Sequence, residues 1–563
     1  MNKNLLFALT LISTFIFSDA LYSQKYWVMF KNKNGTPYST SSPGAFLSAK
    51  SIARRANQGI AVNSTDLPVT PSYVSQVDAV AGVTVLYRCK WLNGVVVSIS
   101  TSTTTALATI NSFTFVQTTN RVNKYQLTFP PIQTNTSIPT NGDRTQSPSA
   151  YNYGASLNQA QMIGADCLHN LGYRGQGMTI AVLDAGFTDV QNFDIFDSLF
   201  MQGRLLGCRD FVDGFGDTTV FTEHTHGAEV LSTMAGIKSG SVIGTAPQAS
   251  YWLLRTEDAA TETMSEEYNW IRGAEFADSV GADVTTTSLG YTTFDSGAPS
   301  ANDHSYSQLN GKTAPMSIAA NMAARKGMLV LNAAGNEGCG SPMSCWYYIS
   351  VPSDADSIIT VGAVDPGKSK AGFSSFGPTA DGRIKPDLVA QGGPALVCLY
   401  GSGCFMGNGT SFATPVLAGA VTCLWQSKKL ATNMQIIQAL KATADSASTP
   451  NNRIGWGVPN MCAARTSTVL ANVGVHEYVD DHNIRIYPNP FSGELNIWIN
   501  DLPSENIHVT ITNVLGQTVY NQFVTGPSGG VIHLTEVADY KPGIYFVNLS
   551  AGDARITKKI VKQ

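Results

Sequence analysis

Apolar and polar positions in the middle of the chain follow two alternating periods. Short segments typical of strands occur at 179–183, 282–286, 328–333 and 358–364, and stretches with helical spacing occur near 265–280 and 315–326. The second helical stretch begins at Pro315 and is followed by Gly327, which is the usual asymmetry of helix ends. Strands that alternate with helices predict a parallel sheet flanked by helices, so this region is expected to be an α/β domain.

The regions on either side show different patterns. Near the N-terminus a small α/β unit is predicted, with strands at 26–30, 83–87 and 94–99 and helices near 46–56 and 73–80. A segment rich in Thr, Ser, Asn and Pro at 134–149 is typical of an exposed linker. After residue 465 an all-β sandwich is predicted from short alternating strands at 484–487, 495–499 and 509–512, with a turn at 513–517.

Length and composition agree with several folded domains. The chain of 563 residues is too long for one ordinary domain, and its 43% hydrophobic and 13% charged residues are typical of folded, secreted material rather than of disorder. The net charge of −4 and the lack of a long basic run argue against a nucleic-acid partner.

The first residues have the pattern of a secretory signal peptide. Lys3 precedes an apolar run at 5–17 that is too short to span a bilayer. Cleavage is expected either after Ala20 or between Ser23 and Gln24. No later apolar run reaches the length of about 18 residues that a membrane-spanning helix needs, so no transmembrane segment is expected.

Cysteine usage agrees with export. Of the nine cysteines, Cys89 falls in the N-terminal unit and the other eight fall in the middle region, an even number that fits disulfides. The pairs Cys339 with Cys345 and Cys398 with Cys404 are close in sequence and are expected to bridge loops. Buried thiols are the alternative, because sequence alone does not establish which cysteines pair.

Three segments of the middle region carry residues suited to nucleophilic catalysis. Ser411 lies among small residues where an apolar helix begins, and the amides of a helix start stabilise negative charge that develops nearby. Asp184 ends a buried strand just before a glycine turn, at an edge of the sheet where ligands of α/β folds bind. His226 begins a further helix. Taken singly, the serine and the aspartate are also typical of helix N-caps.

The order Asp184, His226, Ser411, with a glycine close to each residue, resembles the subtilase family of serine proteases. The resemblance covers roughly 151–465. Other segments follow in the order that the family has. Asn336 stands at the position of the family's oxyanion-hole asparagine, and its substrate-binding edge strand is matched by Ser288, Leu289 and Gly290.

The resemblance implies a role for each residue. Ser411 would be the nucleophile, His226 the general base that takes its proton, and Asp184 the group that orients the imidazole. Two residues depart from the family pattern: Ala185 stands where Ser or Thr is usual, and Glu229 where a second histidine is common. Neither departure changes the side chains of Asp184, His226 or Ser411, so we expect both to affect the rate of the reaction more than its type.

A metal-dependent reaction is the main alternative for this region. His224 and His226 are potential ligands, but no His-Glu-x-x-His or Cys-x-x-Cys motif accompanies them. The family's chemistry requires no cofactor. Subtilases often hold structural calcium, yet no ligand-spaced loop is visible, so no metal ligand is assigned from the sequence. Glu337, beside Asn336, is either a residue that favours basic substrates or a solvated surface carboxylate.

The flanking regions carry resemblances of their own. The N-terminal unit is similar in pattern to subtilase propeptides, with a separate binding module as the alternative. Three C-terminal segments resemble the sorting domain of type IX secretion substrates: Tyr-Pro-Asn-Pro at 487–490, Lys-Pro-Gly-Ile-Tyr-Phe at 541–546 and Lys-Lys-Ile-Val-Lys at 558–562. A carbohydrate-binding sandwich is the alternative there.

Together these patterns predict a subtilisin-like α/β domain between a small α/β propeptide and an all-β sandwich. The expected division is a signal peptide at 1–23, a propeptide at 24–133, a linker at 134–149, a catalytic domain at 150–465, a linker at 466–483 and a sorting domain at 484–563. The implied function is that of a secreted or outer-membrane surface-attached endopeptidase. Its expected partners are protein or peptide substrates, its own propeptide and the type IX secretion machinery. A surface-binding protein on a catalytically weak subtilase scaffold, and an esterase, are the alternatives.

Overall fold

The computed structural model describes residues 24–100, 103–122, 150–212, 217–294, 302–340, 345–471, 484–499, 506–525, 530–551 and 554–563. The expected signal peptide at 1–23 and the expected linker at 134–149 lie outside these ranges. The chain divides into two compact units: Met1–Cys423 with Leu440–Cys462, and Leu424–Ala439 with Ala463–Gln563.

The first unit is built around a parallel sheet. Its seven strands have the order β13-β12-β11-β10-β5-β9-β6, and every neighbouring pair is parallel. The predicted parallel sheet is therefore confirmed. Its central strands are buried along their whole length because helices cover both faces, whereas β6 at one edge is partly exposed. The strand bounds are β5 Thr179–Asp184, β6 Leu205–Asp210, β9 Ser250–Arg255, β10 Val284–Thr287, β11 Leu329–Ala333, β12 Ile359–Val364 and β13 Leu388–Gln391.

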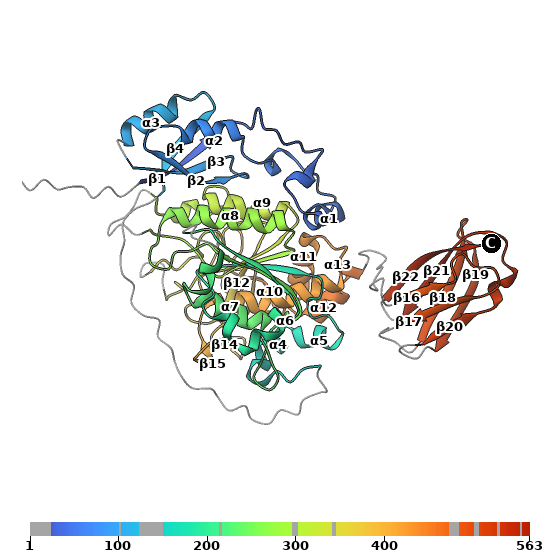
Figure 1. The fold of residues 1–563 in the computed structure, drawn as a ribbon. Helices are drawn as coiled ribbons and strands as arrows, with labels where there is room; N and C mark the ends of the chain where they lie inside the picture. Colours follow the sequence, from blue (N-terminus) through green and yellow to red (C-terminus); the bar gives the residue numbers. More distant parts are fainter. Residues whose placement is uncertain are drawn as a thin grey trace, which may run out of the picture. The chain divides into compact units, whose positions relative to one another are not determined.

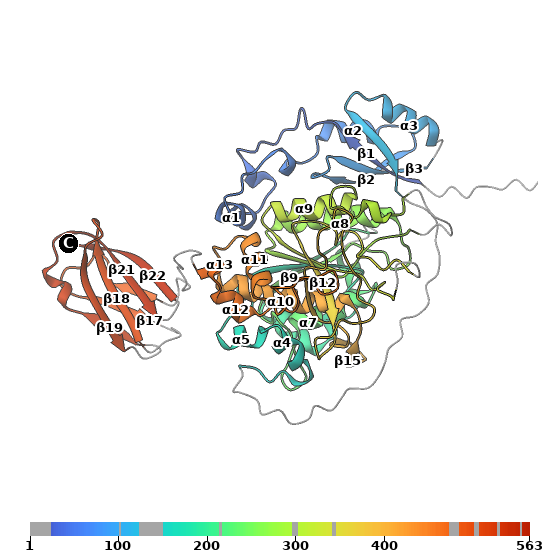
Figure 2. The same ribbon diagram turned by 180° about the vertical axis from the view of Figure 1, so that it is seen from behind.

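Helices flank this sheet (Figures 1 and 2). The two predicted helices are α8 and α9, which lie side by side on one face. Helix α8 begins at a capping box formed by Thr263 and Glu266 and ends at Gly281, whose φ of +86° suits glycine. The helices wholly in the first unit from residue 150 onward are α4 Leu157–Met162, α5 Ala165–Asn170, α6 Asp197–Met201, α7 His226–Ala235, α8 Met264–Val280 and α9 Pro315–Arg325. Helices α10 Thr410–Ser427, α11 Asn433–Thr443 and α12 Met461–Thr466 belong to both units, and α13 Thr468–Ala471 belongs to the second.

Two small antiparallel hairpins add to the first unit. They are β7 Ile237–Lys238 with β8 Val242–Ile243, and β14 Ala395–Leu399 with β15 Gly403–Gly407. The second hairpin is bridged by the expected disulfide Cys398–Cys404. The other expected pair, Cys339 with Cys345, is also bonded, and a third disulfide joins Cys167 to Cys462. The even number of cysteines does not pair completely, because Cys208 and Cys423 are free thiols.

The N-terminal region forms a four-stranded antiparallel sheet of order β2-β3-β1-β4, carrying short helices. Its core is its own and includes Val28, Val95 and Ile110. The predicted strands and helices are present, and α3 and β4 are additional. The element bounds are β1 Gln24–Phe30, α1 Ala49–Asn57, α2 Pro71–Asp78, β2 Val83–Cys89, β3 Gly94–Ile99, α3 Thr103–Ser112 and β4 Val116–Arg121.

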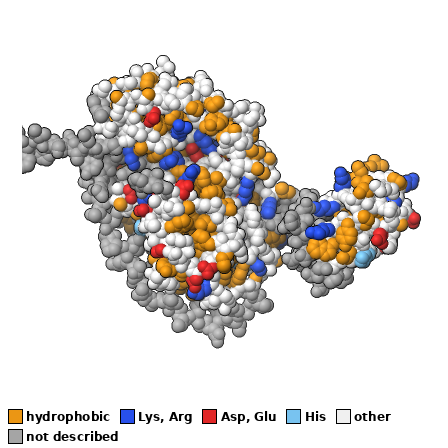
Figure 3. Space-filling model, viewed as in Figure 1, with side chains coloured by type: hydrophobic (Ala, Val, Ile, Leu, Met, Phe, Trp, Pro, Cys, Tyr) orange, Lys and Arg blue, Asp and Glu red, His pale blue; other side chains and the backbone are white. Residues whose placement is uncertain are grey.

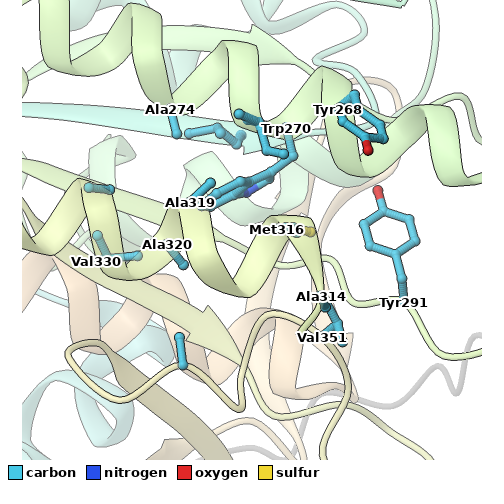
Figure 4. Packing of buried hydrophobic residues seen from close by; sticks show 14 of the residues in the cluster. Tyr268, Trp270, Ala274, Tyr291, Ala314, Met316, Ala319, Ala320, Val330 and Val351 are labelled. Atoms are coloured by element: carbon cyan, nitrogen blue, oxygen red, sulfur yellow. The ribbon is translucent and has the colours of Figure 1, made fainter. Parts of the chain in front are cut away.

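One face of this N-terminal sheet packs on helices α8 and α9. Trp27 and Trp91 belong to the same buried cluster as Trp270, and the ring of Trp27 stacks on Tyr268 with centroids 4.7 Å apart. Figure 4 shows the inner side of this cluster, where Trp270 of α8 lies against alanines of α9. The two helices thus bury apolar side chains toward both sheets.

Charged side chains are also buried where the N-terminal sheet meets these helices. Asp278 of α8 is paired with Arg54 and with Arg55, the latter at 2.8 Å. Arg55 and Lys326 both pair with Asp66, each at 2.9 Å. None of the five side chains is more than 5% exposed. A buried charge is costly without a partner because it has lost its contact with water. Each of the two carboxylates is accordingly paired with two cationic side chains.

The C-terminal strands of the second unit form two antiparallel sheets, of orders β16-β17-β20 and β19-β18-β21-β22, around one apolar core. This confirms the predicted all-β fold. Hydrophobic side chains are also visible on the surface of this sandwich (Figure 3). The strands are β16 Ile484–Tyr487, β17 Leu495–Ile499, β18 Asn506–Asn513, β19 Thr518–Thr525, β20 Val531–Leu534, β21 Gly543–Ala551 and β22 Ala554–Lys562. Across the described residues of both units, no helix combines the length and apolarity needed to cross a membrane.

Candidate active site

The predicted site residues meet at one edge of the parallel sheet. Asp184 is the last residue of β5, Ser288 directly follows β10, and Asn336 lies three residues beyond β11. These three strands are neighbours in the sheet, so their carboxyl ends meet at the same edge. The starts of two helices reach the same edge, since His226 is the first residue of α7 and Ser411 the second of α10.

Asp184 and His226 are joined by a short hydrogen bond. His226 Nδ1 lies 2.7 Å from Asp184 Oδ1, and the Asp184 side chain is fully buried. The backbone N–H of Ala185 donates to the same oxygen at 2.8 Å. Ala185, which departs from the family pattern, therefore still contributes a backbone donor to the carboxylate. This bond leaves Nε2 as the ring nitrogen that faces other partners.

The environment favours a proton on His226. Burial by itself lowers the pKa of the imidazole, but the charge and hydrogen bond of Asp184 raise it more, and Glu229 and Glu257 act in the same direction, so that its pKa is raised to about 9. Burial also raises the pKa of Glu229, the second departure from the family pattern. The acidic neighbours thus make His226 a stronger base than a free imidazole.

Ser411 is linked to the edge segment after β10. Its hydroxyl donates to the Ser288 carbonyl at 3.2 Å, and the Ser288 hydroxyl donates to the Ser411 carbonyl at 2.7 Å. In this state the Ser411 hydroxyl is engaged with a backbone acceptor. Hydrogen bonds between reacting groups are often long or poorly aligned until substrate is bound.

Asn336 is held through its side-chain oxygen. Asn336 Oδ1 accepts hydrogen bonds from the backbone N–H and from the hydroxyl of Thr410, both at 2.9 Å. With the oxygen so occupied, the NH2 group is the part of the amide that remains to donate. Thr410, which the sequence did not single out, fixes that orientation from the residue before Ser411.

These residues line a cleft of about 540 Å³. His226, Ser411 and Asn336 all border it, while Asp184 lies buried behind His226. The predicted edge segment borders it too: Ser288, Leu289 and Gly290. A side chain at Gly290 would not fit, because a Cβ there would lie 2.0 Å from Ser350 Oγ. The backbone of this segment is thus open to a ligand on one side and closely packed on the other.

The cleft also contains two glutamates that the sequence reasoning missed, Glu257 and Glu262. His224, which the sequence offered only as a potential metal ligand, lines it too, and among the described lining residues there is no Lys or Arg. Glu337 borders it as well, and its carboxylate accepts from the backbone N–H of Asn336 at 3.0 Å. The cleft is therefore acidic. The sequence does not reveal this because the acidic residues come from separate loops.

Among the described residues, one group of three side chains has potential metal-ligand atoms within 4.8 Å of one another: Glu257, Glu262 and Glu266. His224 and His226 do not belong to such a group. The nitrogen His226 Nδ1 is already committed to Asp184.

Comparison with known proteins agrees with this architecture. The model of the subtilase family matches residues 175–457, about half of the chain. The chain belongs to the subtilase family. A peptidase S8 propeptide domain of the Bacteroidota matches residues 25–137, and a secretion system C-terminal sorting domain matches residues 485–563.

Several subtilisins are similar to about half of the chain. Subtilisin Savinase from Lederbergia lenta is 31% identical over 303 residues, which cover 54% of this chain and 96% of that protein. Subtilisin NAT from Bacillus subtilis subsp. natto is 31% identical over 299 residues, covering 52% of this chain and 68% of that protein. This subtilase is thus a subtilisin-like protease with a propeptide and a type IX sorting tail, and the tail marks it as secreted or attached to the cell surface.

Proposed function

We propose that this subtilase is a serine endopeptidase that hydrolyses peptide bonds through an acyl-enzyme on Ser411. The observation that carries the proposal is the Asp184–His226 hydrogen bond of 2.7 Å beside a cleft that Ser411 and Asn336 also line. A base, an orienting carboxylate, a hydroxyl and an amide donor in one cleft are the groups that acyl transfer requires.

In the proposed first step, neutral His226 takes the proton of Ser411 through Nε2 while the Ser411 oxygen attacks the substrate carbonyl. Asp184 holds the ring in the tautomer that leaves Nε2 free to accept, and it stabilises the imidazolium that forms without taking the proton itself. The imidazolium then gives its proton to the leaving amine, and an acyl group stays on Ser411. A water molecule activated by His226 releases that group by the same steps.

Negative charge on the attacked oxygen requires donors. The NH2 group of Asn336 and the backbone N–H of Ser411, at the start of α10, are the proposed donors. Thr410 supports this role because its two hydrogen bonds to Oδ1 turn the Asn336 NH2 group toward the cleft. The backbone of Ser288, Leu289 and Gly290 would pair with the substrate as an added strand. None of these steps requires a cofactor.

The flanking domains support a secreted zymogen. The N-terminal sheet is the proposed inhibitory propeptide, expected at 24–133, and it is held on α8 and α9 by the buried ion pairs of Asp278 and Asp66. The sorting domain, expected at 484–563, would direct export by the type IX machinery. The catalytic domain, expected at 150–465, would remain as the active protease.

Peptide hydrolysis tests this function. The purified chain, with its propeptide removed, is given an internally quenched peptide library, and the Ser411→Ala variant is measured alongside it. A serine protease should lose about 10⁶ in kcat on this substitution. If the wild type cleaves only a small ester, or if both proteins have the same slow rate, the endopeptidase proposal is wrong and the surface-binding scaffold gains support.

A further inference from the structure

Strands β10 and β11 separate at the cleft, and a buried asparagine lies where they part. The ladder between them ends at the pair Thr287 and Asn332, while β11 stays paired with β12 through Ala333. The chain that leaves β10 is the edge segment Ser288–Gly290, which lines the cleft. Carbonyl groups that leave a ladder lose their backbone donors, so those that stay buried need other donors.

The side chain of Asn332 supplies one of these donors. Its Nδ2 donates to the Leu289 carbonyl at 3.1 Å and lies 2.9 Å from both the Ala333 carbonyl and Ser353 Oγ. Carbonyl groups only accept hydrogen bonds, so the end of the amide that faces them is its NH2 group. The side-chain amide thus continues the pairing of β11 with the chain from β10 beyond the end of the ladder.

Stability alone does not explain an asparagine at this position. Asn332 is fully buried, and its Oδ1 has no hydrogen-bond partner among the described residues. A buried polar atom without a partner is costly, and asparagine is also a poor strand former. The useful part of the side chain is its donor end, which is directed at the edge segment of the cleft.

The edge segment is held by backbone contacts on either side of Leu289. Ser288 exchanges two hydrogen bonds with Ser411, and Tyr291 exchanges two with Val351 at 2.9 and 3.0 Å. The consecutive carbonyls of Ser288 and Leu289 have different partners, as expected of an extended segment whose peptide groups alternate in direction. Asn332 therefore holds the middle of the segment, between its contacts with Ser411 and with Val351.

We propose that Asn332 is a positioning residue that keeps Ser288–Gly290 in the extended form that pairs with the substrate backbone. The inference rests on the proposed peptidase function and assigns part of its substrate binding to a residue outside the cleft lining. Without the amide, the Leu289 carbonyl lacks its donor, and the segment would shift toward another one. A shift of about 1 Å is enough to weaken binding to a substrate strand.

The test compares two substrates of the protease that forms from the full chain. One is an amide of a single blocked amino acid, and the other carries three further residues before that amino acid and has the same leaving group. Only the longer substrate can pair along the edge segment. In the wild type, kcat/KM should be at least about 10-fold higher for the longer substrate. In Asn332→Ala this ratio should fall by about 10-fold, since one hydrogen bond contributes up to that factor.

A second variant keeps the test decisive if Asn332→Ala does not fold. Asn332→Thr introduces a β-branched residue of similar volume that favours a strand. Its hydroxyl is one bond shorter than the amide, so it should not replace the bond to Leu289, and the ratio should again fall.

The matched control is Asn321→Ala. Asn321 of α9 is also a buried asparagine with three hydrogen bonds to backbone groups, those of Gly311, Asp356 and Ser357, and it does not line the cleft. Its replacement should lower the melting temperature about as much as Asn332→Ala does, yet keep the wild-type ratio.

The outcomes separate the positioning role from the peptidase function. Both substrates use Ser411, His226 and Asn336, so any loss in the catalytic groups cancels in the ratio. An unchanged ratio in a folded Asn332 variant, or an equal fall in Asn321→Ala, would overturn the positioning role and leave the peptidase function standing. A wild type without any preference for the longer substrate would do the same. No hydrolysis of either substrate by the wild type would refute the peptidase function, and the inference with it.

Discussion

At the scale of single residues, Asn336 and Thr410 act together. The two hydrogen bonds from Thr410 to Asn336 Oδ1 keep the NH2 group in one orientation. Asn336→Ala should lower kcat by about 10² to 10³ with little change in KM, because the lost donor acts mainly on the charged transition state. Steady-state kinetics on one peptide would measure this. A variant with wild-type kcat would show that Asn336 is a turn residue only.

The base strength of His226 predicts a pH profile. Only neutral His226 can accept the Ser411 proton, and its pKa is raised to about 9, so it is mostly protonated at pH 7. The value of kcat/KM should therefore rise with pH up to about 9 and then level off. The measurement uses a peptide without titratable groups. A plateau already reached at pH 6 would contradict the role of the acidic neighbours.

The proposed catalytic residues could be found in the sequence because each lies in a short local pattern. Asp184, His226 and Ser411 each stand at the end of a strand or the start of a helix with a glycine nearby, and those patterns need no knowledge of the rest of the chain. Glu257 and Glu262 give no such signal, because the cleft that they line is assembled from distant segments that only the folded chain brings together.

At the scale of elements, α8 has two packed sides. Its outer side receives α1 of the N-terminal region through Asp278, which is paired with Arg54 and Arg55, while Trp270 packs in the core with alanines of α9. The same helix thus joins the proposed propeptide to the core of the subtilase domain.

Removal of one charge from this interface should weaken it strongly. Asp278→Asn leaves the buried guanidinium of Arg54 without a carboxylate and leaves Arg55 with Asp66 alone, so the free energy of unfolding of the uncleaved chain should fall by about 3–5 kcal/mol. Denaturant unfolding in the Ser411→Ala background, which prevents self-cleavage, would measure it. Asp194→Asn, which breaks an exposed pair with Lys238, is the control and should cost at most about 1 kcal/mol. Equal effects of the two substitutions would refute the role of the buried pairs.

The sequence predicted some elements and not others for physical reasons. Strands β5, β11 and β12 are covered on both faces and are rich in apolar residues. Strand β10 is buried as well, and its threonines are β-branched residues that favour a strand. Helix α3 is rich in Thr and buries only Ala106 and Ile110, so its helical period is weak. Strand β4 at the sheet edge has one fully buried residue, Val116, and lacks a clear alternation. The free thiols of Cys208 and Cys423 were likewise not predictable from the even cysteine count.

At the scale of the whole molecule, the C-terminal sandwich has an apolar core of its own, formed within residues 491–560. The family match and this separate core predict that the sandwich determines export and not catalysis. Deletion of residues 484–563 should stop the protein from reaching the medium or the cell surface, while the truncated chain keeps its peptidase activity in a lysate. Immunoblots of cell fractions, together with an activity assay, would test both parts. Normal export of the truncated chain would contradict this role of the sandwich.

The domain order also predicts how the protein matures. Self-cleavage needs Ser411, so the wild type should lose its N-terminal region during folding, whereas the Ser411→Ala chain should keep it. The expected boundary between propeptide and catalytic domain remains a prediction, since residues 123–149 lie outside the described structure.

The most direct test of the central claim is the intact mass of the folded, propeptide-free protein before and after treatment with a fluorophosphonate, with Ser411→Ala treated in parallel. We predict the addition of one phosphonyl group in the wild type, mapped to Ser411 by peptide sequencing, and no addition in the variant. An unmodified wild type with all three disulfides intact, or labelling that persists in Ser411→Ala, would contradict a Ser411 acyl-enzyme mechanism.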